Sequence, residues 1–203
     1  MNIISLFKHL ALNRIGYTNR MYENYLSNEE NIHDTCISTE KKLDKTYSQL
    51  FNNNKWLNMH FNHCACIFIF KNKTISTLCI GHNTYYTNNT TLHAEEAVFK
   101  KLLNCNETKQ LKINVAIIKI TRDGQYRNSK PCVHCLQSMY ITSQKKGYKL
   151  NKIYYTNDDN TISSSTYLNL LYSDNFHISS YYKNNNFNID KWYRWRNALL
   201  KIK

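Results

Sequence analysis

The order of apolar runs and amphipathic segments that begins at His63 constrains the fold most strongly. The run Cys64–Phe70 is almost entirely apolar, as is typical of a strand covered on both faces. Further runs of strand length lie at residues 74–80, 113–120 and 152–156, with a weaker one at 161–164. The turn residues Asn157–Asn160 separate the last two runs, so we expect them to form a hairpin.

Two helical segments alternate with these runs. Leu92–Asn104 carries one apolar stripe at helical spacing, and Pro131–Lys145 carries another. Pro131 stands where proline is favoured in a first helical turn, and Gly147 can end that helix. The order is therefore β-β-α-β-α-β with one further strand, which predicts an α/β domain with helices packed on a sheet.

The chain divides into three parts by composition. Residues 1–58 form a polar extension with weak helical patterns, one over residues 3–11 and one over residues 40–51. Residues 59–166 form the predicted α/β domain. Residues 167–203 form a C-terminal extension that is rich in Tyr and Asn and closes with a basic, aromatic helix near 190–200.

The net charge of +13 would attract phosphate-bearing ligands, from nucleotides to nucleic acids. However, Lys, Asn, Ile and Tyr all have AT-rich codons, so biased composition explains much of this charge. The number of cysteines is odd, at seven, and no secretory signal is evident. Cys64 and Cys66 share one strand face, where core packing is expected. We therefore expect a reduced, intracellular and cytoplasmic protein, and no membrane partner, since no apolar run could span a bilayer.

Two short motifs stand at the starts of the two predicted helices: His93-Ala94-Glu95 and Pro131-Cys132-Val133-His134-Cys135. A catalytic zinc site has three protein ligands and leaves one position open, and His93, Cys132 and Cys135 supply that number. Such a site makes hydroxide available near neutral pH. Glu95 is then placed to move protons, as a general acid and base. A closed structural zinc site would need a fourth ligand.

Together these motifs resemble the cytidine deaminase-like superfamily, whose signature is H-x-E followed by P-C-x-x-C. The resemblance covers about residues 60–165. It implies a three-layer α/β/α fold with a mixed sheet of about five strands. It also implies Zn²⁺ as cofactor, His93, Cys132 and Cys135 as ligands, and Glu95 as the catalytic residue. The implied reaction is hydrolysis of an exocyclic amine on a nucleobase-type ring, most simply in a cytosine nucleoside or nucleotide, with release of ammonia.

The resemblance leaves the substrate open. Members often place a substrate-binding Asn at the end of the second strand, where Gly81-His82-Asn83 stands, although a plain turn explains those residues equally well. Tyr85 occupies the position of a ribose-binding Glu in enzymes that act on free cytidine. His93 as first ligand favours nucleotide or tRNA deaminases, whereas a hairpin at 157–164 favours the cytidine type.

Two rival functions remain, and the oligomeric state is also open. One rival is a deaminase acting on tRNA or single-stranded nucleic acid, and the other is a non-catalytic zinc-binding module. Arg127 and Lys130 could meet a phosphate, but solvated loop charge is the more frequent explanation. Glu96 is expected to be a solvated carboxylate, and His134 a surface residue or a neighbour of the ligands. Trp192–Arg196 could stack bases, but packing on the domain is favoured.

Overall fold

The structure is a computed structural model that describes residues 2–11, 61–85, 91–104, 111–121, 124–179, 183 and 187–200. The helix expected over 40–51 lies outside these residues, as does most of the predicted N-terminal extension. The strands are β1 (Phe61–Lys71), β2 (Thr74–His82), β3 (Thr84–Tyr85), β4 (Thr91–Leu92), β5 (Lys112–Thr121), β6 (Tyr126–Arg127), β7 (Lys149–Thr156) and β8 (Ile162–Thr166). The helices are α3 (Ala94–Leu103), α4 (Val133–Lys145), α5 (Tyr167–Tyr172) and α7 (Ile189–Leu200), and a further helix covers residues 3–11.

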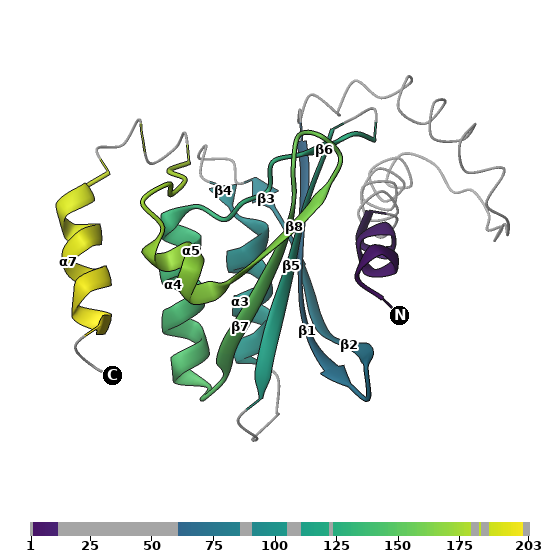
Figure 1. The fold of residues 1–203 in the computed structure, drawn as a ribbon, viewed down its shortest axis with the longest axis horizontal. Helices are drawn as coiled ribbons and strands as arrows, with labels where there is room; N and C mark the ends of the chain where they lie inside the picture. Colours follow the sequence, from purple (N-terminus) through teal and green to yellow (C-terminus); the bar gives the residue numbers. More distant parts are fainter. Residues whose placement is uncertain are drawn as a thin grey trace, which may run out of the picture.

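The main sheet is mixed and has the strand order β2-β1-β5-β7-β8, with the short β6 paired to the end of β5. β5 and β7 are parallel, and α4 forms the crossover between them, whereas the other neighbours are antiparallel. β7 and β8 form the expected hairpin, whose turn includes Asn160 at a positive φ of 61°. The mixed α/β sheet predicted from the order of elements is thus confirmed (Figure 1).

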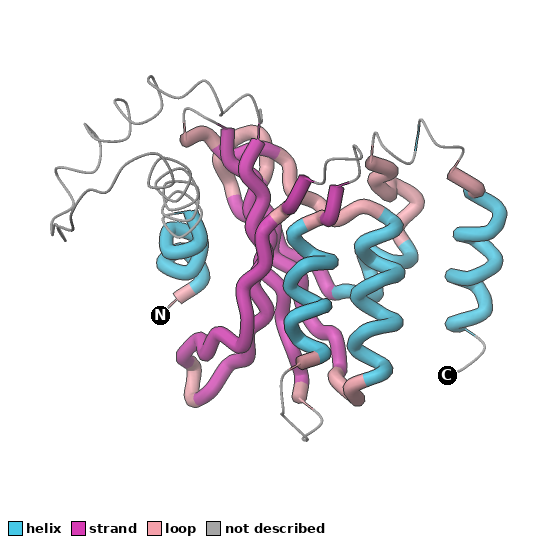
Figure 2. The backbone as a smooth tube through the Cα atoms, turned by 180° about the vertical axis from the view of Figure 1, so that it is seen from behind, coloured by secondary structure: helices cyan, strands magenta, loops and turns pink. Residues whose placement is uncertain are grey.

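Successive side chains of a strand point to opposite faces of the sheet, and both faces of this sheet are covered. In β5, Val115 and Ile117 belong to the core cluster beneath α3 and α4, while Ala116 and Ile118 belong to a second cluster. Figures 1 and 2 show α3 and α4 on one side of the strands and the helix over residues 3–11 on the other. The three-layer α/β/α architecture is therefore confirmed.

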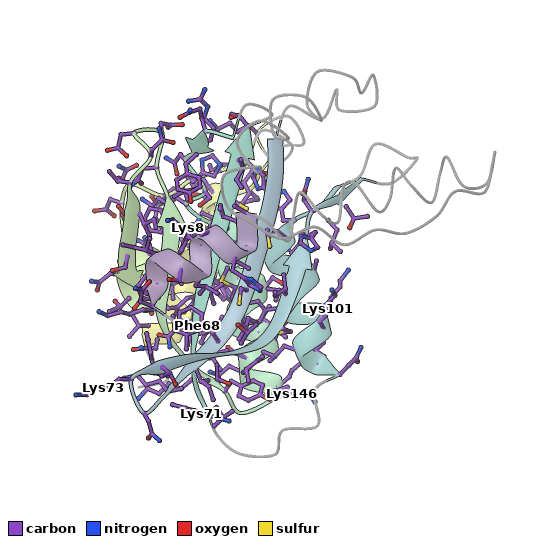
Figure 3. The ribbon with its side chains drawn as sticks, turned by 90° about the vertical axis from the view of Figure 1, so that its right-hand side faces the viewer. Lys8, Phe68, Lys71, Lys73, Lys101 and Lys146 are labelled. Carbon is purple, nitrogen blue, oxygen red and sulfur yellow. The ribbon has the colours of Figure 1, made fainter. Side chains whose placement is uncertain are left out.

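The helix over residues 3–11 forms the second helical layer. Leu6, Phe7 and Leu10 are fully buried in the same cluster as Cys66 and Phe68 of the sheet, as the apolar face predicted for this segment requires. Figure 3 views this helix lying across the strands, with Lys8 labelled on it and Phe68 among the side chains of the sheet. Cys64 is buried in the same cluster, so the core role expected of Cys64 and Cys66 is also confirmed.

The C-terminal helices pack on the α4 side of the molecule. Tyr167 and Leu171 of α5 and Trp192 of α7 belong to the core cluster beneath α3 and α4, and Trp192 is only 4% exposed. The ring of Trp195 lies edge-on to Tyr140 of α4, with their centroids 5.8 Å apart. The aromatic stripe of α7 therefore packs on the domain, as favoured from the sequence. Among the described residues, no helix is both long and apolar enough to cross a membrane.

Candidate metal centre

Two of the predicted ligands occupy equivalent positions at the starts of neighbouring helices. His93 is the N-cap of α3, and Cys132 is the N-cap of α4, each with an extended backbone. Both helices thus begin later than expected, because the preceding residues are held in extended structure. Leu92 pairs with Thr84 in the small β3–β4 sheet, and Cys132 forms a β-bridge with His177. Pro131 consequently precedes the helix and does not stand in its first turn.

The sheet and its contacts bring these two helix starts together. α3 reaches β2 at Gly81, where a Cβ would lie 2.4 Å from the backbone nitrogen of Val98 and 2.8 Å from the carbonyl oxygen of Ala94. Only glycine permits this close approach of helix to strand. Gly81 therefore sets the distance of α3, and with it His93, from the sheet.

The three predicted ligand residues converge on one point. The Nδ1 atom of His93 lies 3.2 Å from the Sγ atom of Cys135 and 3.7 Å from that of Cys132. All three ligand atoms lie within 4.8 Å of one another, and no other described His, Cys, Asp or Glu joins the group. Both cysteines are buried. The cluster can hold a metal ion, and one imidazole with two thiolates is a donor set typical of zinc.

The two cysteines of the cluster differ in their tendency to ionise. A hydrogen bond with Cys135 lowers the pKa of the Cys132 thiol well below its usual value, while burial raises the pKa of Cys135. The hydrogen bond with Cys132 raises the pKa of His93 to about 9. The site therefore favours a thiolate on Cys132, which is the form in which cysteine binds metals.

Glu95 lies in the first turn of α3, two residues after His93, and points into the protein. Its side chain is 5% exposed, and its Oε2 atom has no hydrogen-bond partner among the described residues. Burial raises the pKa of this carboxyl group, while the charge of His93 opposes that shift. A buried oxygen without a partner costs free energy, which indicates that the position serves something other than stability.

Glu96 and His134 form a bridge between the two helix starts that sequence reasoning did not foresee. The Oε1 atom of Glu96 lies 3.0 Å from Nε2 of His134, and its Oε2 accepts a hydrogen bond from the backbone N–H of His93 at 3.2 Å. Burial opposes ionisation of Glu96, but its hydrogen bonds with His134 and with the backbone of His93, together with the charges of the two imidazoles, outweigh the effect of burial, so the pKa is lowered. The prediction that Glu96 is a solvated carboxylate was therefore wrong. A Glu three residues after an N-cap has the spacing of a capping box, so the hydrogen bond of Glu96 with the backbone of His93 could have been predicted from the sequence.

Buried hydroxyl groups fasten the segment that leads into Cys132. Ser129 donates to the carbonyl oxygen of Ile117 in β5, and its Oγ accepts from the backbone N–H of Thr156 in β7, both at 2.8 Å. The hydroxyl of Thr156 donates to the carbonyl oxygen of Arg127 at 2.7 Å. This network ties the segment before α4 to two strands, and no pattern in the sequence predicts it.

The remaining candidate residues have varied surroundings. The Oδ1 atom of Asn83 accepts a hydrogen bond from the backbone N–H of His63 at 3.0 Å, so its side chain helps to close the β1–β2 pair. Contact of Asn83 with a substrate stays a prediction. Arg127 and Lys130, expected to be solvated loop charges, are half-buried and line one pocket.

The arrangement as a whole is an α/β fold with a mixed sheet and a His-Cys-Cys cluster at the starts of two adjacent helices. This is compatible with the zinc deaminase fold that the motifs resemble. No protein-family model matches the chain, and no curated protein sequence matches it.

Proposed function

We propose that this chain is a zinc-dependent hydrolytic deaminase that acts on a nucleobase-type ring, most simply the cytosine of a nucleoside or nucleotide. The reaction would replace the exocyclic C–N bond of the ring with a C–O bond from water and release ammonia. The observation that carries the proposal is the convergence of His93, Cys132 and Cys135 beside Glu95, a buried carboxyl group with one unpartnered oxygen.

His93, Cys132 and Cys135 would hold the zinc ion. Three ligands without a fourth among the described residues fit a catalytic site better than a closed structural one. The chemistry that zinc supplies when bound is Lewis-acid activation of water near neutral pH. The N-termini of α3 and α4 favour the negative charge of the thiolates that meet there.

Glu95 would move the protons of the reaction. Its carboxylate is outside the ligand cluster, although its residue follows His93 by two positions, so it can exchange protons without binding the metal. The unpartnered Oε2 atom would accept a proton from water and pass it to the ring nitrogen and then to the leaving amine. Burial at 5% exposure keeps bulk water from competing for this proton.

The β7–β8 hairpin supports a cytosine ring as substrate. In the superfamily that the motifs resemble, a hairpin at this place is typical of the cytidine type, whereas His93 as first ligand is typical of nucleotide and tRNA deaminases, and a cytosine nucleotide would be consistent with both features. A non-catalytic module is the weaker alternative, since a scaffold gains nothing from the cost of burying the unpartnered oxygen of Glu95.

The test is a screen for ammonia release by the zinc-loaded protein, with cytosine, adenine and guanine nucleosides and nucleotides and with tRNA. We expect release from a cytosine compound. Glu95→Gln should lower turnover by about 10²–10⁴-fold or more while retaining zinc and the thermal midpoint. Asp190→Asn, at an exposed acid on α7, is the matched control and should leave turnover unchanged. A folded, zinc-loaded protein that releases ammonia from none of these compounds would refute the proposal.

A further inference from the structure

A small pocket lies beside the metal centre. Its volume is about 260 Å³, which is below the roughly 300–1,000 Å³ of sites that enclose a whole small molecule. It therefore suits one group of a larger ligand. The residues that line it come from β5, β6, the segment before α4, the β7–β8 turn and the segment after α5: Lys119, Arg127, Asn128, Lys130, Asp158 and His177.

Backbone pairing fixes the pocket next to the ligand cluster. Lys119 of β5 pairs with Arg127 of β6. Lys119 follows Ile117 by two residues on the same strand, so both side chains lie on the face of the sheet that α3 and α4 cover. His177 bridges to Cys132 through the backbone, and its carbonyl oxygen accepts from the N–H of Val133 at 2.9 Å. The pocket and the metal centre are thus neighbours.

Positive groups dominate the lining. Lys119, Arg127 and Lys130 are half-buried, whereas Asp158 is exposed and its Oδ1 already accepts a hydrogen bond from the backbone N–H of Asn128. Within the described part of the chain, no hydrogen bond or ion pair engages the guanidinium group of Arg127. The ammonium group of Lys130 donates to the carbonyl oxygen of Asn175 at 2.6 Å, which leaves two of its three donors for a ligand.

We propose that this pocket binds a phosphate group of the substrate, with Arg127 and Lys130 as its principal donors. The inference rests on the proposed function and deepens it, because it identifies the substrate as a phosphorylated nucleoside. A planar guanidinium group binds two phosphate oxygens at once, and a lysine ammonium adds a point charge. Three half-buried cations line this small cavity against the single exposed carboxylate of Asp158, and this excess of positive charge matches a phosphate better than a neutral sugar.

The phosphate could belong to a free nucleotide or to the backbone of a nucleic acid, since both present the same oxygens. The experiment separates these sources by calorimetric titration of the zinc-loaded protein carrying Glu95→Gln, in which turnover is suppressed. The ligands are cytidine, cytidine 5′-monophosphate, inorganic phosphate and a short single-stranded oligonucleotide with one cytosine. Arg127→Gln is then added, and Arg194→Gln on α7 is the matched control, since Arg194 is exposed and does not line the pocket.

We expect the monophosphate to bind at least about tenfold more tightly than cytidine, and inorganic phosphate to compete with it. Arg127→Gln should weaken binding of the monophosphate by about tenfold or more, as expected for a lost charged hydrogen bond. The same variant should leave the affinity for cytidine unchanged. Arg194→Gln should change neither affinity. The same pattern with the oligonucleotide in place of the monophosphate would support the phosphate site and assign its source to nucleic acid. Lys130→Gln provides a second variant if the thermal midpoint of Arg127→Gln falls.

Failure of this inference differs from failure of the proposed function. If cytidine and its monophosphate bind equally and Arg127→Gln changes neither, the phosphate site is refuted while a deaminase remains. A second outcome is that inorganic phosphate binds and its binding requires Arg127, while no nucleoside binds and none yields ammonia. The pocket is then an anion site, and the proposed deaminase activity is refuted.

Discussion

Gly81→Ala tests how the fold sets the position of the metal centre. The added Cβ would lie 2.4 Å from the backbone nitrogen of Val98, and an ordinary van der Waals contact begins at 3.4 Å. The atoms it meets belong to the backbone of α3 and cannot rotate away. We therefore expect α3 to move from β2 by about 1 Å, which is the difference between these two distances.

The cost follows from the packing that this movement disturbs. Val98, Phe99 and Leu102 of α3 are at most 1% exposed, and burial of each contributes about 1.5–3 kcal/mol. A gap of 0.5–1 Å forfeits about a quarter to a half of the dispersion energy of a contact. For three side chains these fractions give about 1–4.5 kcal/mol, and the middle of that range, a loss of about 2–3 kcal/mol in the free energy of unfolding, lies within the range of about 1–3 kcal/mol for overpacked cores. The shift also displaces His93 from Cys135.

Urea unfolding followed by circular dichroism, with and without zinc, measures both effects. Gly81→Ala should lose about 2–3 kcal/mol and should also retain zinc less tightly. Gly124→Ala is the control: its φ of +81° makes alanine strained there by about 1–2 kcal/mol, but an added Cβ meets nothing within 4 Å. That variant should keep its zinc. A Gly81→Ala protein with a loss below about 0.5 kcal/mol and unchanged zinc affinity would refute the reasoning.

Three further predictions use other parts of the chain. Atomic absorption should find one zinc per chain in the purified protein. Cys132→Ser and Cys135→Ser should each lose this zinc, whereas the control variant Cys66→Ser should retain it. Zinc retained in both ligand variants would contradict the site. Burial raises the pKa of Cys66 to about 12 from 9.0, so at pH 8 its thiolate fraction is about 1,000-fold lower and should rise only as the pH approaches 12. Peptide mass spectrometry after iodoacetamide treatment should find Cys66 unlabelled in the folded protein, and equal labelling before and after denaturation would exclude this. Deletion of residues 188–203 should lower the thermal midpoint by several degrees, since Trp192 is 4% exposed, and it should not remove zinc; salt-sensitive binding of nucleic acid that disappears with these residues would favour a base-stacking role instead.

The main strands of the sheet could be predicted from the sequence because the pattern of apolar residues along each strand matches its burial. The apolar run at Cys64–Phe70 is filled on both faces, and the turn at Asn157–Asn160 forms the hairpin that its residues favour. The convergence of His93 and the two cysteines could be predicted as well, because these residue types stand at a recognisable spacing.

The details around the cluster could not be predicted, because they depend on contacts between segments distant in the sequence. The helix starts moved to Ala94 and Val133 because strand-like pairing holds the residues before them. Arg127 was expected in solvent, and only the register with Lys119 places it in a pocket. Such pairings carry no local signal, since any polar residue is acceptable in a loop.

The C-terminal segment supports the His-Cys-Cys cluster even though it contains none of the three residues. The carbonyl oxygen of His177 accepts the N–H of Val133, one of the donors that the start of α4 would otherwise leave unpaired. Phe176, the preceding residue, lies against the rings of Trp192 and Tyr193 of α7, with centroids 6.4 Å and 5.9 Å away. Helix α7 therefore packs on the residues that hold Cys132 in its extended N-cap conformation. The buried ring of Trp192 and the partly buried rings of Tyr193 and Trp195 have a structural role in this arrangement, which is why base stacking is not needed to account for them.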